Sequence, residues 1–161
     1  MKMMMCAKLS AEDAMCAVSV ATLQMVRKIA NGRNGDHGGR SSRNMRERWA
    51  DVIHGLMGEI ALARTINLPW TPGGMFVSCG DVANKLEVRA TEYQNGHLLI
   101  YDSDPVESPF VLMIGHYPQF AIAGGILGKN ARCEEWWRPD ADPPCWWVPQ
   151  PALTDISEFI R

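Results

Sequence analysis

Two acidic residues and one arginine have the types and the spacing that suit phosphate chemistry around a divalent cation. Asp81 is followed six positions later by Glu87-Val88-Arg89, in a segment whose apolar residues alternate as in a β-strand. Alternation places the side chains of Glu87 and Arg89 on the same face of that strand. Carboxylate oxygens are the ligands that Mg²⁺ prefers, and a nearby positive charge stabilises charge on a phosphate. The segment therefore predicts a small metal site.

A predicted helix upstream of this segment would contribute a third carboxylate. Glu59 lies beside the apolar stripe of that helix, next to Gly58, which would let a sheet approach closely. Three carboxylates at one end of a sheet would repel one another unless a cation lay between them. We expect Glu59, Asp81 and Glu87 to bind Mg²⁺ or Mn²⁺, and we expect Arg89 to stabilise transition-state charge. The alternative is that Glu59 is a boundary glutamate that extends to water.

The elements that must position these residues follow from the apolar periodicity. Apolar residues recur every three or four positions at 10–30 and 44–67, which predicts two helices, with Ser10 as the N-cap of the first. The chain has 161 residues, of which 47% are hydrophobic, enough for one domain with a core. We expect a single α+β domain in which helices pack on a mixed central sheet. Residues 1–43 would form a helix and a basic flexible loop, and residues 44–161 the core.

Beyond residue 75 the apolar period changes to two, which indicates strands. They are predicted near 75–79, 85–91, 97–102 and 110–115, and Asn95-Gly96 predicts a hairpin turn between the second and the third. The segment 119–127 fits either a strand or a helix. Toward the C-terminus we expect a short helix at 132–138, a short strand at 146–148 and a helical turn at 153–160.

The charge distribution suggests a surface for nucleic acid. The net charge is −2, but the segment from Arg27 to Arg48 contains seven Lys or Arg residues against two acidic ones. The residues expected to contact a nucleic-acid backbone are Arg40, Arg43, Arg46, Lys129 and Arg132. A solvated flexible loop explains the basic segment equally well. Two tryptophan pairs, at 136–137 and 146–147, would stack unpaired bases or, alternatively, cover the core or bind a partner.

Several classes of protein are disfavoured by composition. No run approaches the roughly 18 apolar residues of a membrane span, and the first residues lack the apolar core of a signal peptide. The five cysteines show no Cys-x-x-Cys spacing, so we expect reduced thiols and no zinc. We therefore expect a cytoplasmic protein with no membrane partner.

The order of a helical glutamate, an aspartate and then Glu-x-Arg resembles the PD-(D/E)xK nuclease superfamily. The flanking segments, over about residues 50–155, resemble small uncharacterised phage and prophage proteins. The resemblance implies a restriction-endonuclease-like αβββαβ core. It also implies that Glu59 is the helical acid, that Asp81 and Glu87 are the two motif acids, and that Arg89 takes the position usually held by lysine. Gly80 stands where the motif has proline.

The resulting expectation is a metal-dependent nuclease that acts on DNA or RNA and is encoded by a phage. Because Arg89 replaces lysine, the alternative is an inactive nuclease-like protein that binds nucleic acid, a nucleotide signal or a host defence protein. A third hypothesis is a structural protein that assembles through its tryptophans. The expected partners are nucleic acid, a host or phage protein, and a second copy in a homodimer.

Overall fold

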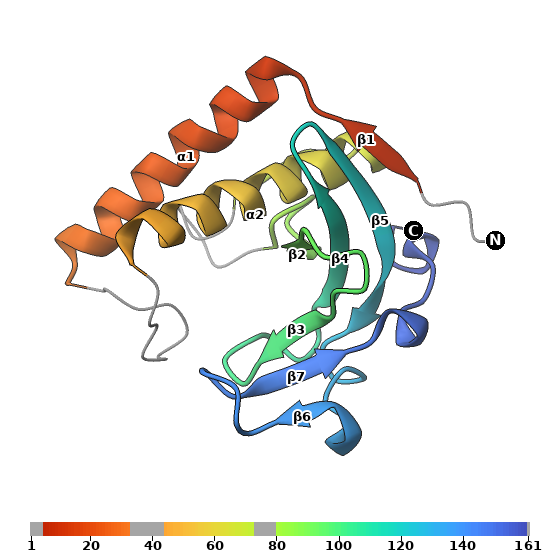
Figure 1. The fold of residues 1–161 in the computed structure, drawn as a ribbon. Helices are drawn as coiled ribbons and strands as arrows, with labels where there is room; N and C mark the ends of the chain where they lie inside the picture. Colours follow the sequence, from red (N-terminus) through yellow and green to blue (C-terminus); the bar gives the residue numbers. More distant parts are fainter. Residues whose placement is uncertain (1–4, 33–43, 73–79, 161) are drawn as a thin grey trace.

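The computed structural model describes residues 5–32, 44–72 and 80–160. Two long helices and two β-sheets lie in three layers (Figure 1). One helix covers one face of a strongly curved four-stranded sheet and the other helix packs against the first. A three-stranded sheet packs against the other face of the larger sheet. The expectation of one α+β domain with helices on a mixed sheet is confirmed.

Both helices begin at capping boxes. Helix α1 (Ala11–Ala30) starts after Ser10, whose side chain accepts a hydrogen bond from the Asp13 backbone N–H, and the Asp13 carboxylate accepts one in return. Helix α2 (Met45–Ile66) starts after Asn44 with the same exchange and ends at Asn67, whose φ is 53°. Within the described ranges, no helix has the length and apolar character required to cross a membrane.

The larger sheet has the strand order β1-β5-β4-β2. Its strands are β1 (Cys6–Lys8), β2 (Glu87–Thr91), β4 (Pro109–His116) and β5 (Gln119–Leu127). Strands β2 and β4 are parallel and the other pairs are antiparallel, so the sheet is mixed. Strand β4 is buried on both faces: Val111 and Met113 belong to the core below the helices, and Phe110 and Leu112 to the core below the smaller sheet. The ambiguous segment 119–127 is a strand.

The smaller sheet has the order β3-β7-β6 and is antiparallel. It contains β3 (Leu98–Tyr101), β6 (Trp137–Arg138) and β7 (Cys145–Val148). The predicted hairpin at Asn95-Gly96 is wrong, because β2 and β3 belong to different sheets; the segment forms a turn in which the Gly96 N–H donates to the Tyr93 carbonyl.

The remaining C-terminal elements are short. Three 3₁₀ helices are found, at Glu134–Trp136, Gln150–Ala152 and Ile156–Glu158. The predicted helix at 132–138 is thus one 3₁₀ turn followed by β6, because Trp137 pairs with Trp146 of β7. In the part of the chain that the structure describes, no α-helix follows β5. The predicted strand at 75–79 lies outside the described residues.

Close packing of α2 on β2 depends on one glycine. A Cβ atom on Gly58 would lie 2.7 Å from the Ala90 Cβ, whereas a Cβ on Gly55 of the same helix would meet nothing within 4 Å. We expect Gly58→Ala to lower the free energy of unfolding by about 1–3 kcal/mol, because the helix must move off the strand. The matched variant Gly55→Ala should raise it by up to about 1 kcal/mol, because alanine favours a helix. Urea denaturation measures both, and equal effects would contradict the close approach.

Candidate functional site

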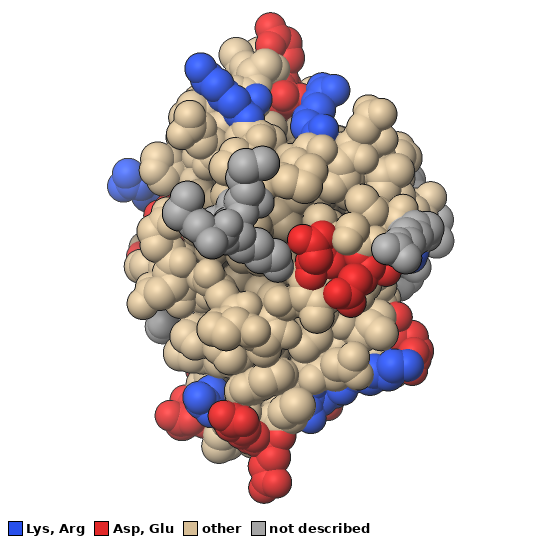
Figure 2. Space-filling model, turned by 90° about the vertical axis from the view of Figure 1, so that its right-hand side faces the viewer, with Lys and Arg blue, Asp and Glu red and all other residues tan. Residues whose placement is uncertain are grey.

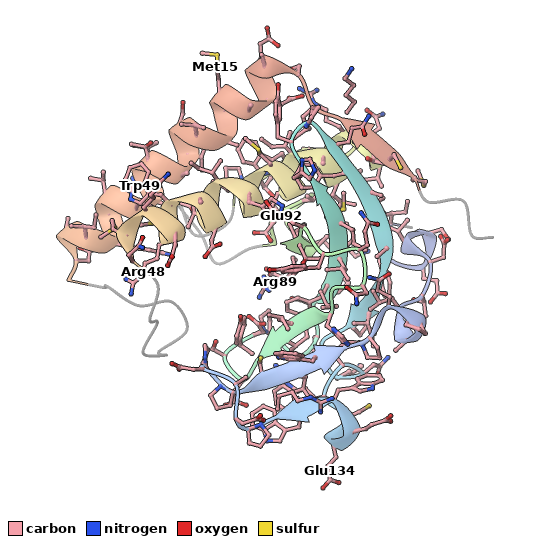
Figure 3. The ribbon with its side chains drawn as sticks, in the orientation of Figure 1. Met15, Arg48, Trp49, Arg89, Glu92 and Glu134 are labelled. Carbon is pink, nitrogen blue, oxygen red and sulfur yellow. The ribbon has the colours of Figure 1, made fainter. Side chains whose placement is uncertain are left out.

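The residues predicted to form the metal site lie at the edge of the larger sheet, where β2 is the last strand. They are Glu59, Asp81, Glu87 and Arg89. Val88 of β2 packs in the core below the helices, and Ala90 packs on that core. Arg89 extends on the other face, toward β3, as Figure 3 shows. The expected alternation along β2 is confirmed. Glu59 reaches the same edge from α2, so acidic residues approach it from both faces.

Asp81 is held by a compact loop that folds back onto β2. Its carboxylate accepts a hydrogen bond of 2.8 Å from the Val88 backbone N–H, and its side chain is buried. Isolated bridges between residues 80 and 84 and between 82 and 86 close the loop. Ala83 and Asn84 both have a φ of 54°, a left-handed conformation that costs about 1–2 kcal/mol for a residue such as alanine. Such strain is often found at functional sites.

Glu59 is fixed by an aromatic neighbour. The Trp70 Nε1–H donates a hydrogen bond of 2.9 Å to Glu59 Oε2. Burial, and then the nearby Asp81 carboxylate, raise the pKa of Glu59 well above its ordinary value. This environment favours the protonated form of Glu59 over the ionised form. Trp70 is a site residue that the sequence did not reveal, since indole N–H groups have no characteristic spacing.

Arg89 is anchored by an acid that the sequence analysis did not select. Its Nη2 lies 2.9 Å from both oxygens of Asp104, and Asp104 also accepts the Tyr101 backbone N–H at 2.9 Å. The guanidinium lies over the Phe110 ring, 5.3 Å from its centroid, and the buried Nε has no hydrogen-bond partner. From the sequence, Asp104 is either a further ligand or, as its position after a predicted strand favours, an ordinary turn acid. Nothing in the local pattern indicates a partner fifteen residues away.

The electrostatics of the site are dominated by crowded acids. Four carboxyl groups, from Glu59, Asp81, Glu87 and Asp104, surround one guanidinium. Burial and the Asp81 carboxylate raise the pKa of Glu87 to about 7, and burial raises the pKa of Asp81 as well. The positive charge of Arg89 opposes these increases, but the pKa of each of the three acids predicted as ligands stays raised. The arrangement favours binding of either protons or a cation.

The described residues contain no group of three His, Cys, Asp or Glu side chains arranged to hold one metal ion. The contacts give the reason. Glu59 comes from the helix side and accepts from Trp70, Asp81 accepts from the Val88 N–H, and Glu87 lies on the strand that carries Arg89. The acids are close enough to influence one another, but the three do not form a closed cage.

Three of the basic residues predicted to contact nucleic acid, Arg46, Lys129 and Arg132, lie in the described part of the chain. Lys129 forms an exposed ion pair of 2.9 Å with Glu107. Arg132 donates to the carbonyl groups of Gly128, Tyr101 and Asp104, so it ties a loop to the smaller sheet. Arg46 is exposed on the first turn of α2.

Arg40 and Arg43 lie outside the described residues. Figure 2 shows the side of the molecule that carries β1 and β5. Its charged residues lie in separate groups, with uncharged residues between them, so the described part of this face carries no continuous basic surface.

The raised pKa of Glu87 predicts a pH-dependent stability. A carboxyl group whose pKa rises from 4.5 to about 7 on folding stabilises the folded state below pH 4.5, and this stabilisation is lost as the pH rises toward 7. We expect the free energy of unfolding to fall over this window in the absence of divalent cations. Glu87→Gln should remove roughly 1–2 kcal/mol of that fall, since Glu87 is partly exposed. Denaturation of the native protein and of Glu87→Gln at pH 5 and at pH 7.5 tests this. If the free energy of unfolding fell equally in both proteins between the two pH values, the prediction would be contradicted.

Protein-family models, curated proteins and solved structures give no match to this chain. The fold and the site define an α+β protein with an acidic cluster at the edge of a mixed sheet.

Proposed function

We propose that the protein is a divalent-cation-dependent phosphodiester hydrolase that acts on DNA or RNA, with a restriction-endonuclease-like core encoded by a phage. One observation supports this most: Glu59, Asp81 and Glu87 come from a helix, a loop and a strand to one sheet edge, where burial and mutual repulsion penalise their charges. A cluster with no catalytic or binding role would gain stability by losing one of these acids. Mg²⁺ or Mn²⁺ would remove the penalty.

Two carboxylates suffice for such a cation. Mg²⁺ commonly binds through one or two carboxylates and completes its shell with water and substrate phosphate oxygens. Asp81 and Glu87 fit this role best, because Glu59 is engaged by Trp70 and favours its protonated form. When bound, the cation would supply an acidic water molecule and would offset charge on the phosphate. The absence of a three-residue cage among residues 5–32, 44–72 and 80–160 is compatible with this type of site.

The protein residues contribute position and charge. The Val88 N–H fixes the Asp81 carboxylate, and Asp104 fixes the Arg89 guanidinium beside it. Because Arg89 lowers the pKa of Asp81 and Glu87, it favours the ionised form that binds a cation. The same positive charge would attract the phosphate group of a substrate.

A cleavage assay tests this function. The protein would be incubated with single- and double-stranded DNA and RNA, in Mg²⁺, in Mn²⁺ and in chelator. We expect cleavage of at least one substrate with a cation and none with chelator. Failure to cut any substrate, or cleavage that survives chelator or Glu87→Ala, would contradict the proposal.

Arg89 favours a second candidate, a protein that binds without hydrolysis. Its Nη2 is bound to both oxygens of Asp104 and its Nη1 donates to the Val88 carbonyl, so fewer donors remain for a phosphate. Such a protein would bind nucleic acid, a nucleotide signal or a host defence protein. Calorimetry separates the candidates, because a pure binder would take up no Mg²⁺ through its carboxylates.

A further inference from the structure

An aromatic groove lies at the smaller sheet, beside the end of β3 and strands β6 and β7. It has a volume of about 630 Å³, and its lining includes Tyr101, Trp137 and Trp146 together with Pro143 and Pro144. This volume is in the range of sites for small organic ligands such as a nucleotide. The groove is thus a ligand-sized surface built from flat, apolar rings.

The rings of the groove are held in place by their neighbours. The Trp137 and Trp146 ring centroids are 4.4 Å apart, and the Arg132 guanidinium lies 5.3 Å from the Trp146 centroid. Trp137 also pairs with Trp146 across β6 and β7. Fixed aromatic side chains lose little entropy when a planar ligand binds, which favours stacking.

The polar groups that line the groove suit a base better than a phosphate. Its described lining contains no Lys or Arg, and its one acidic residue is the exposed Asp102. A carboxylate repels phosphate but accepts hydrogen bonds from the amino groups of adenine, cytosine or guanine. The volume far exceeds that of a small quaternary ammonium group, the other ligand that aromatic rings and an acid attract.

Tyr101 joins the groove to the acidic cluster. Its ring lies 6.0 Å from the Arg89 guanidinium carbon, and its backbone N–H donates to Asp104. A strand with one base in the groove would therefore pass near the Arg89–Asp104 pair. We infer that the groove binds an unpaired, amino-bearing nucleobase, so that the substrate is a single strand; this inference rests on the proposed function.

Tryptophan fluorescence tests the groove independently of cleavage. Oligo(dA), oligo(dC), oligo(dT) and a duplex would be titrated into the full chain in chelator, where no hydrolysis occurs. We expect oligo(dA) and oligo(dC) to quench the fluorescence and to bind more tightly than the duplex or oligo(dT). Trp137→Ala should weaken oligo(dA) binding at least about fivefold, the effect of one stacked base, and Trp137→Phe should restore most of it.

Trp147→Ala is the matched control, because Trp147 neighbours Trp146 on β7 but contacts His97 and does not line the groove. It should leave oligo(dA) binding unchanged. Asp102→Ala should remove the preference over oligo(dT). Equal losses in the Trp137 and Trp147 variants, tighter duplex binding, or displacement of the oligonucleotide by tetramethylammonium would overturn the inference. Base binding without cleavage would refute only the proposed hydrolysis, and cleavage with full activity in Trp137→Ala would refute only the groove.

Discussion

Replacement of Asp104 by alanine is expected to destabilise the fold by about 3–5 kcal/mol. The Asp104 side chain is 8% exposed, and it accepts hydrogen bonds from Arg89 and from the Tyr101 backbone N–H. Its loss leaves the largely buried Arg89 guanidinium without its hydrogen-bonded counter-ion and the Tyr101 N–H without its acceptor, and this costs more than the ion pair itself contributes. Urea denaturation at neutral pH measures the effect.

The control is the exposed ion pair of Lys129 with Glu107, whose side chains are 53% and 73% exposed. Glu107→Ala should change the free energy of unfolding by less than about 1 kcal/mol, because water screens the pair. Similar small losses in the Asp104 and Glu107 variants would show that Asp104 does not anchor the site.

Replacement of Asp81 by asparagine is expected to reduce cleavage at least about 100-fold while the fold is retained. The asparagine Oδ1 can still accept the Val88 N–H, so the loop keeps its hydrogen bond. The negative charge that would hold the cation is removed, and several kcal/mol of transition-state stabilisation should be lost with it. Initial rates of cleavage and a thermal denaturation curve, measured on the same preparation, separate activity from folding.

Glu134→Gln is the control for this substitution. Glu134 is exposed on the 3₁₀ helix before β6 and lies far from Arg89 in Figure 3. Its substitution should leave the cleavage rate unchanged. If Asp81→Asn retained most of the activity, the acidic cluster would not be the catalytic site.

The helices and the face alternation of β2 follow from local pattern. The capping residues Ser10 and Asn44 satisfy the first N–H groups of each helix within three positions, which is a purely local interaction. Glu59, Asp81 and Glu87 can be predicted as ligands for the same reason, since residue type and spacing are visible in the sequence. The structure adds that β2 is an edge strand, which allows acids from both faces to come near one another.

The pairing of the smaller sheet depends on contacts that are distant in sequence. Leu98 pairs with Val148, fifty residues later, and no periodicity indicates this choice over a hairpin with β2. No local pattern indicates the ion pair of Asp104 with Arg89 either, or that Tyr101 lines the aromatic groove. These contacts are decided by loop closure and by packing of the core between the two sheets, and both depend on the whole chain.

Titration of the full chain with Mn²⁺ by calorimetry at about pH 6.5, in two buffers of different ionisation enthalpy, tests the central claim most directly. Because the pKa of Glu87 is raised to about 7, this carboxyl group holds a proton at this pH before a cation binds. We predict saturable binding with release of protons, both lost in Asp81→Asn and kept in Glu134→Gln. No saturable binding, or binding that Asp81→Asn leaves unchanged, would contradict the assignment of a cation site to the acidic cluster.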